Sequence, residues 1–166
     1  MKKAPRELVT FDADAMRAQL KAHIVTHSTV EHIDTEAHGL IVNETPLRYS
    51  KLVLALGADA RRIPLTGDAA DDVLSVNCLY DYARFRKRLH GAKTVALLGA
   101  GLIGCEFAND LALAGYNVML IDPASTPLSR LLPQQAGNAL AQALEQHGIR
   151  MMLDTTVQAV NKAQHG

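Results

Sequence analysis

The sequence predicts an α/β fold whose best-defined part is a parallel sheet covered by helices. Two apolar runs of strand length, at 94–98 and 116–121, alternate with segments of helical periodicity at 102–114 and 133–147. A third strand-like run follows at 149–153. Strands that alternate with helices form parallel sheets, because each helix carries the chain back to the edge where the next strand starts.

The composition is that of a globular protein and excludes several functional classes. Of the 166 residues, 48% are hydrophobic and 20% charged, and 17 basic side chains balance 17 acidic ones, so we expect no affinity for nucleic acid. No apolar run reaches the ~18 residues of a membrane span, and no signal-peptide core follows Met1, so we expect a cytoplasmic protein. Cys78 and Cys105 fit no CxxC redox pair, and the histidines show no metal-binding spacing, so we expect no metal site.

The first part of the chain, up to residue 92, predicts a mixture of short elements. A short helix is expected from Asp12 to Lys21, because its acidic start suits the helix dipole. The run 52–56 is continuously apolar, which is typical of a strand covered on both faces. The remaining expected elements are strands at 23–27, 29–34 and 40–43, a loop at 59–72 and a helix at 80–89.

From Lys93 onward the strand and helix segments follow one another without long interruptions. Their β-α-β-α-β order is that of the mononucleotide-binding half of a doubly wound, Rossmann-type sheet. The spacing of apolar residues also predicts which helix positions face the sheet. These are Ile103, Phe107 and Leu111 in the first helix, and Ala139, Leu140, Ala143 and Leu144 in the second.

Three glycines form a GxGxxG motif between the first strand and the first helix of this part. Gly99 allows a sharp turn, Gly101 allows the backbone to approach a pyrophosphate, and Gly104 allows the helix to pack on the strand. The phosphates would then meet free N–H groups at the positive end of the helix. This context favours dinucleotide binding over a purely structural turn. The loop positions expected to contact the cofactor are Gly99, Ala100, Gly101, Leu102, Ile103 and Gly104.

Asp122 ends the second strand, about 20 residues beyond Gly99, where dinucleotide-binding proteins carry an acid. Its carboxylate can accept hydrogen bonds from the adenosine ribose hydroxyls, but it would repel a 2′-phosphate. No Arg or Lys lies between Asp122 and Ser129 to neutralise such a phosphate. The sequence therefore predicts NADH rather than NADPH. A second interpretation is that Asp122 caps the turn before Pro123.

Glu106 admits two interpretations. It lies near the start of the helix that follows the glycines, where the helix dipole stabilises a carboxylate. That placement alone gives it a structural role. The functional interpretation places Glu106 near the nicotinamide or near a second cofactor.

Longer blocks of sequence resemble a known family. The GxGxxG helix, preceded by YSKLVLALGA at 49–58, resembles the two-dinucleotide flavoprotein reductases, in which an NAD domain is inserted into an FAD domain. More narrowly, DYARFRKRL at 81–89 and LLGAGLIGCEFANDL at 97–111 resemble the rubredoxin–NAD reductases of alkane-degrading bacteria. The reductases of flavorubredoxin are similar but more distant. The resemblance extends over nearly the whole chain.

The resemblance implies a cofactor pair and a partner. It implies FAD and NAD as cofactors, with hydride passing from NADH to the flavin and single electrons passing to a rubredoxin-like protein. No protein side chain is then expected to act as a catalytic residue, because the flavin carries the chemistry. A reductase of flavorubredoxin or ferredoxin and a non-catalytic NADH-binding module are the alternatives.

The resemblance also implies contacts with the flavin cofactor. It implies that Val30 touches the FAD adenine, that Ala55 and Gly57 belong to the end of the first FAD segment, and that Glu106 approaches the flavin and nicotinamide. One departure is Leu56, where many relatives have a threonine that can hydrogen-bond a cofactor.

The same resemblance suggests how the chain divides. Residues 1–92 would form a partial FAD-binding domain without its own GxGxxG unit, and residues 93–166 the N-terminal half of an NAD-binding domain. The sequence then resembles a middle fragment of a longer reductase. Such a fragment is expected to bind FAD poorly and to be inactive alone.

Overall fold

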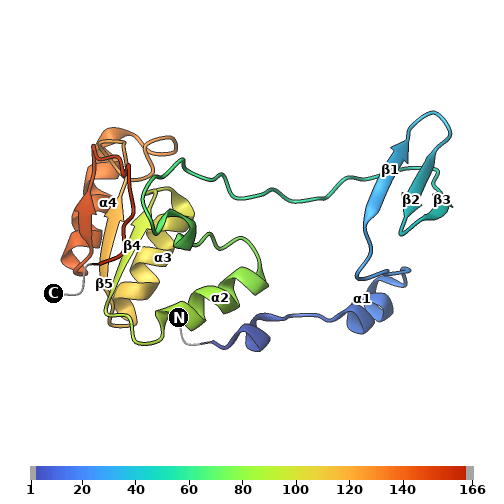
Figure 1. The fold of residues 1–166 in the computed structure, drawn as a ribbon, viewed down its shortest axis with the longest axis horizontal. Helices are drawn as coiled ribbons and strands as arrows, with labels where there is room; N and C mark the ends of the chain where they lie inside the picture. The colour runs from blue at the N-terminus through green and yellow to red at the C-terminus, as the bar shows by residue number, and fades with distance from the viewer. Residues whose placement is uncertain (1–2, 164–166) are drawn as a thin grey trace. The chain divides into compact units, whose positions relative to one another are not determined.

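A computed structural model describes residues 3–163 and shows two compact units. The smaller unit spans Arg6–Asp59, and the larger one comprises residues 3–5 together with residues 60–163 (Figure 1). The mixture of helices with one antiparallel and one parallel sheet confirms the predicted α/β class. The predicted division at residue 92 concerns which cofactor each part binds, and it stays a prediction.

The smaller unit consists of one helix and an antiparallel sheet. A 3₁₀ helix at Pro5–Leu8 precedes α1, Ala13–Leu20, whose start is capped by the Asp12 side chain, which accepts a hydrogen bond of 2.8 Å from the Ala15 N–H. Strands β1 (Val30–Asp34), β2 (Gly39–Val42) and β3 (Thr45–Arg48) then pair in chain order.

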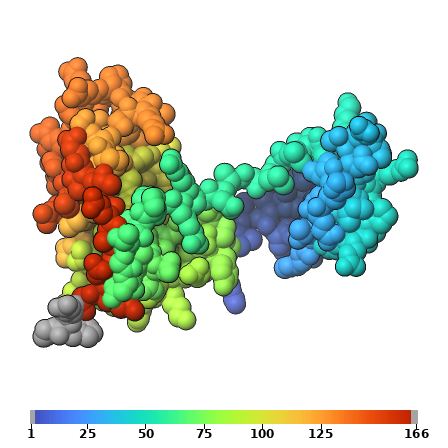
Figure 2. All heavy atoms as spheres, turned by 45° about the horizontal axis from the view of Figure 1, so that its top comes forward, coloured from blue at the N-terminus to red at the C-terminus, as the bar shows by residue number. Residues whose placement is uncertain are grey.

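The predictions of two strands in this unit are wrong. Residues 23–27 and 52–56 have no strand conformation. In the second segment Val53 and Leu56 are 85% and 84% exposed, and Figure 2 shows the turquoise-green atoms of this stretch uncovered on the face in view. A strand buried on both faces must belong to a sheet that other elements cover on both faces. Among the described residues, no strand pairs with 52–56, so its apolar composition produces no sheet here.

The larger unit contains the parallel sheet that the sequence predicts. After a 3₁₀ turn at Ala70–Asp72, the elements are α2 (Leu79–Leu89), β4 (Thr94–Leu98), α3 (Leu102–Leu113), β5 (Asn117–Ile121), α4 (Gln134–Gln146) and β6 (Arg150–Met152). The strands are parallel in the order β4-β5-β6, so β5 hydrogen-bonds on both sides. All the observed ends lie within two residues of the predicted ones, which is the usual uncertainty of helix and strand boundaries.

The core of this unit lies between the sheet and its helices. Leu111 of α3 and Leu120 of β5 are fully buried, and Phe85 of α2 packs edge-on against Phe107 of α3 with ring centroids 5.7 Å apart. The larger buried cluster also contains Leu89, Ala100, Cys105, Ala108, Val118, Leu144 and Ile149. Helix α2 is therefore part of the same core as the parallel sheet.

Three helix positions predicted to face inward do not. Ile103 is 65% exposed, and Ala139 and Ala143 are also exposed. In α4 the buried side runs through Gly137 and Leu144 instead. A side chain at Gly137 would collide with Thr126, so the helix is rotated to place this glycine against the loop that follows β5. Sequence periodicity shows that a helix has an apolar face but does not fix its rotation to within one residue.

Candidate functional site

The site begins at the glycine loop between β4 and α3, where the three glycines have different steric surroundings. Gly99 has a φ of 106°, in the left-handed region that glycine adopts most easily, and its N–H donates to the Ile121 carbonyl over 2.8 Å. A side chain on Gly104 would overlap the Gly99 carbonyl oxygen. At Gly101 an added methyl group would meet no protein atom within 4 Å. The protein itself therefore does not require glycine at 101, and the open space suits an incoming ligand.

The start of α3 presents backbone donors beside this open space. The first helical hydrogen bond runs from the Cys105 N–H to the Gly101 carbonyl, at 2.9 Å. The N–H groups of Leu102, Ile103 and Gly104 precede that bond, and a helix start offers them no carbonyl of its own. Unpaired donors at the positive end of a helix attract anions, of which a diphosphate is one.

Asp122 lies beside this loop and is hydrogen-bonded to it. Its Oδ2 accepts a 2.6 Å hydrogen bond from the Ala100 N–H, and its Oδ1 accepts one of 2.7 Å from the Ala124 N–H. The structure therefore brings together Asp122 and the glycine motif, as the sequence predicts. The Ala124 bond is the turn-capping contact of the second interpretation. Because a carboxylate has about four acceptor positions, it leaves room for a ribose hydroxyl.

Two further residues at the loop were not singled out by the sequence analysis. Leu128, with a φ of 53°, donates its N–H to the Ala100 carbonyl over 2.8 Å, and the Cys105 thiol donates to the same oxygen over 3.4 Å. Burial, and then the negative charge of Asp122, raises the pKa of the Cys105 thiol. No local pattern marks these contacts, because they join segments more than 20 residues apart or depend on helix rotation.

The residues predicted to contact FAD lie in the smaller unit. Val30, at the start of β1, is 48% exposed, and Ala55 and Gly57 are exposed in the irregular segment that follows β3. None of these three residues lines the hollow on the antiparallel sheet of the same unit. Glu106 is exposed on α3 in the larger unit. All four assignments stay predictions.

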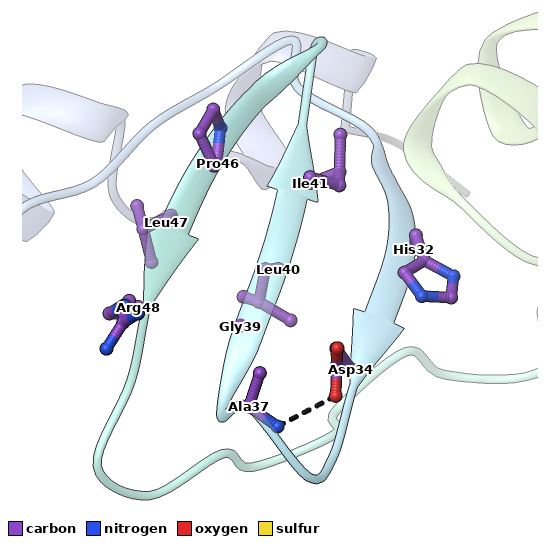
Figure 3. Close-up of a pocket in the computed structure, with 9 residues that line it drawn as sticks. All are labelled: His32, Asp34, Ala37, Gly39, Leu40, Ile41, Pro46, Leu47 and Arg48. Atoms are coloured by element: carbon purple, nitrogen blue, oxygen red, sulfur yellow. Dashed lines mark hydrogen bonds between the residues drawn. The ribbon is translucent and has the colours of Figure 1, made fainter.

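A shallow hollow of about 380 Å³ lies on the antiparallel sheet of the smaller unit (Figure 3). Its polar lining comes from His32 and Asp34 on β1 and Arg48 on β3. The Asp34 carboxylate accepts a 2.8 Å hydrogen bond from the Ala37 N–H, and this contact lowers the pKa of Asp34. The carboxylate therefore serves the β1–β2 turn.

Two further classes of site are absent from the part of the chain that the structure describes. Within residues 3–163 there is no helix long and apolar enough to cross a membrane. The same residues contain no cluster of three or more His, Cys, Asp or Glu side chains that could hold a metal ion.

Comparison with known proteins places the chain among flavin- and nicotinamide-related reductases. The sequence profile of the pyridine nucleotide-disulphide oxidoreductases matches residues 2–165. The chain is 45% identical to the rubredoxin-NAD(+) reductase of Acinetobacter baylyi over 99% of its own length and 43% of that protein. It is 36% identical to the nitric oxide reductase FlRd-NAD(+) reductase of Aliivibrio fischeri, over 98% of the chain and 43% of that protein.

Solved structures show the same fold. The ferredoxin reductase of Rhodopseudomonas palustris matches with a TM-score of 0.86 and 25% identity, over 99% of this chain and 41% of that one. The putidaredoxin reductase in a covalent complex with putidaredoxin matches with a TM-score of 0.83 at 23% identity, over 95% of this chain and 39% of the other, which supports the fold alone. The chain thus spans less than half the length of these proteins.

Proposed function

The chain belongs to the pyridine nucleotide-disulphide oxidoreductase family, and on that premise we propose that it carries the NADH-binding loop of a flavin-dependent NADH:rubredoxin reductase. The observation that supports this most directly is the glycine loop. One edge of the parallel sheet brings together three features: open space at Gly101, free N–H donors at the start of α3, and the Asp122 carboxylate. Dinucleotides bind at this edge, beyond the carboxyl ends of the strands.

Different residues would bind different parts of NADH. The N–H groups of Leu102 and Ile103 would bind the diphosphate, and Asp122 would accept hydrogen bonds from the adenosine ribose. This half of the sheet has Rossmann-type order, so the nicotinamide would lie beyond the loop, where Glu106 is its proposed neighbour. FAD, when bound, would supply the redox chemistry, taking hydride from NADH and releasing single electrons. Val30, Ala55 and Gly57, which are exposed in the smaller unit, are the residues proposed to contact FAD.

The electron acceptor is proposed from the relatives. Rubredoxin is the acceptor in the name of the Acinetobacter relative, and this chain shares more sequence with it than with the Aliivibrio enzyme. A flavorubredoxin or a ferredoxin is the second candidate acceptor, supported by the match to a ferredoxin reductase. The proposal extends to a place in the cytoplasm and in alkane degradation, and the second rests on the resemblance of residues 81–89 and 97–111 to the reductases of alkane-degrading bacteria. A non-catalytic NADH-binding module is the alternative from another class.

Titration of the 166-residue chain with NADH and NADPH tests the nucleotide part of this proposal. Tighter binding of NADH is expected, because Asp122 repels a 2′-phosphate and accepts from a ribose hydroxyl. Equal or tighter binding of NADPH would contradict the role of Asp122. A protein that contains the chain together with bound FAD should then reduce rubredoxin faster than flavorubredoxin or ferredoxin. NADH binding without reduction of any acceptor would favour the non-catalytic module.

A further inference from the structure

We propose that Asp122 is also a positioning residue, which holds the glycine loop through the Ala100 N–H whether or not a nucleotide is bound. This inference rests on the proposed NADH site and assigns Asp122 a second task there. The first task is contact with the ribose, and it requires a nucleotide. The second is a contact within the protein, formed by the 2.6 Å hydrogen bond from the Ala100 N–H to Asp122 Oδ2.

The Ala100 residue is held from both sides. Its N–H donates to Asp122, and its carbonyl accepts from the Leu128 N–H at 2.8 Å and from the Cys105 thiol at 3.4 Å. Ala100 is only 2% exposed. Water therefore cannot replace these partners without local opening, and a lost partner leaves a buried polar group unpaired.

Asp122 is itself fixed by the sheet and the loop beyond it. Its N–H donates to the Met152 carbonyl and its carbonyl accepts from the Thr155 N–H, both at 3.0 Å. The second carboxylate oxygen accepts from Ala124. Asp122 thus connects the Ala100 peptide to the end of β5, to β6 and to the residues that follow these two strands.

The occupied donors indicate which part of the loop meets the phosphates. The Gly99 N–H is bonded to Ile121 and the Ala100 N–H to Asp122, so neither is free for a ligand. The diphosphate would therefore be bound by the N–H groups that follow Gly101, and Ala100 would contribute through its position. A shift of the Ala100 peptide would carry Gly101 and the start of α3 with it.

A nucleotide that lacks both ribose hydroxyls separates the two tasks. We would measure binding of ADP and of 2′,3′-dideoxy-ADP to the original chain and to Asp122→Ala. Alanine has no side-chain oxygen, so the Ala100 N–H loses its acceptor in this variant. Asp110→Asn, at an exposed carboxylate on α3, is the matched control for loss of charge.

The two roles predict opposite results with the dideoxy nucleotide. If Asp122 positions the loop, Asp122→Ala weakens binding of 2′,3′-dideoxy-ADP by about threefold to tenfold, the usual effect of one hydrogen bond. If Asp122 only contacts the ribose, the affinity is unchanged or higher, because a negative charge near the phosphates has been removed. That result would overturn the inference.

Amide hydrogen exchange in the nucleotide-free chain gives a second readout. The Ala100 N–H should exchange at least about tenfold faster in Asp122→Ala than in the original chain or in Asp110→Asn, since it loses its acceptor. Unchanged exchange would overturn the inference. NADH titration of the original chain tests the proposed function separately from this inference. If Asp122 protects the Ala100 N–H from exchange but the chain does not bind NADH, the positioning role is supported and the proposed NADH site is rejected.

Discussion

Gly101 and Gly104 belong to one motif but are required by different partners. Gly104 is required by the protein, because a side chain there would overlap the Gly99 carbonyl oxygen. Gly101 has an ordinary φ of −74° and open space where a side chain would begin. The diphosphate proposed to approach the backbone here would account for glycine at 101.

Substitution at these two glycines should separate folding from binding. Gly104→Ala should lower the free energy of unfolding by about 1–3 kcal/mol, because the backbone must move to remove the overlap. Gly101→Ala should change stability little but weaken NADH binding by about tenfold or more. Denaturant titration and NADH titration measure the two effects. Gly39→Ala is the matched control, since its added carbon lies 4.0 Å from the nearest protein atom and in the other unit.

A Gly101→Ala chain that binds NADH as tightly as the original would contradict the position proposed for the diphosphate. A Gly104→Ala chain of unchanged stability would instead show that the loop relaxes without cost. The two outcomes are independent, because one concerns the ligand and the other the contact between α3 and Gly99.

Cys105 should make stability depend on pH in the alkaline range. Burial raises the pKa of its thiol above the ordinary value of 9.0, so above that pH the unfolded chain releases the thiol proton before the folded chain does. The protonated Cys105 thiol contributes fully to stability below the pKa of the unfolded chain. This contribution decreases as the pH rises toward the higher pKa of the folded chain. We expect the free energy of unfolding to fall more steeply between pH 8 and pH 10 for the original chain than for Cys105→Ala, by denaturant titration at each pH.

The control for this prediction is the other cysteine. Cys78 is exposed, so Cys78→Ala should keep the pH dependence of the original chain. If Cys105→Ala and the original chain show parallel pH profiles, the thiol does not contribute. In the folded protein an alkylating reagent should modify Cys78 first, since the thiolate is the reacting form and Cys105 is buried.

At the scale of elements, β5 is the central strand of the parallel sheet in the larger unit. It pairs with β4 on one side and β6 on the other, and Leu120 near its C-terminal end is fully buried. Leu120→Ala should lower the free energy of unfolding by about 2–5 kcal/mol, because it leaves a cavity in the core. Leu113→Ala, at a leucine 69% exposed on α3, should cost far less. Denaturant titration would contradict the assignment if both variants lost similar stability.

Two segments of similar apolar composition differ in whether the structure confirms the strands predicted for them. The β-α-β-α-β segment is confirmed, because each strand there has a partner within the chain and each helix covers the sheet. The segment 52–56 has an equally apolar composition but no partner strand among the described residues. Composition indicates that a segment is suited to burial, whereas a strand also requires an adjacent strand to bond with.

At the scale of the whole molecule, the two units differ in readiness to bind a cofactor. The glycine loop and Asp122 form one hydrogen-bonded site within the larger unit. Val30, Ala55 and Gly57 are exposed in the smaller unit. The residues proposed to bind NADH are therefore held by hydrogen bonds to one another, whereas the three residues predicted to contact FAD are exposed.

This difference predicts that the purified 166-residue chain contains little or no flavin. Its absorbance spectrum should lack the flavin bands, and added FAD should bind weakly, because exposed residues gain too little contact with the ligand to offset its lost freedom. A yellow protein with one flavin per chain would contradict this. NADH titration of the same sample is the control, since the larger unit is expected to bind its nucleotide without flavin.

The sequence by itself determined the parts of this protein whose causes are local. The GxGxxG spacing, the acid at the end of β5 and the alternation of strand and helix follow from steric and periodic requirements within about 30 residues. They identified the glycine loop, its helix and Asp122 correctly as one neighbourhood, and the resemblance of the longer blocks to reductases is confirmed by the family match.

Only the tertiary structure decided what depends on distant neighbours. It showed that Asp122 bonds to Ala100, that Leu128 closes on the same residue, and that 52–56 remains without a strand partner among the described residues. It also fixed the rotation of α4 through the contact of Gly137 with Thr126. Each of these is a contact between segments separated along the chain, or the lack of one, and no pattern of consecutive residues encodes which segments will meet.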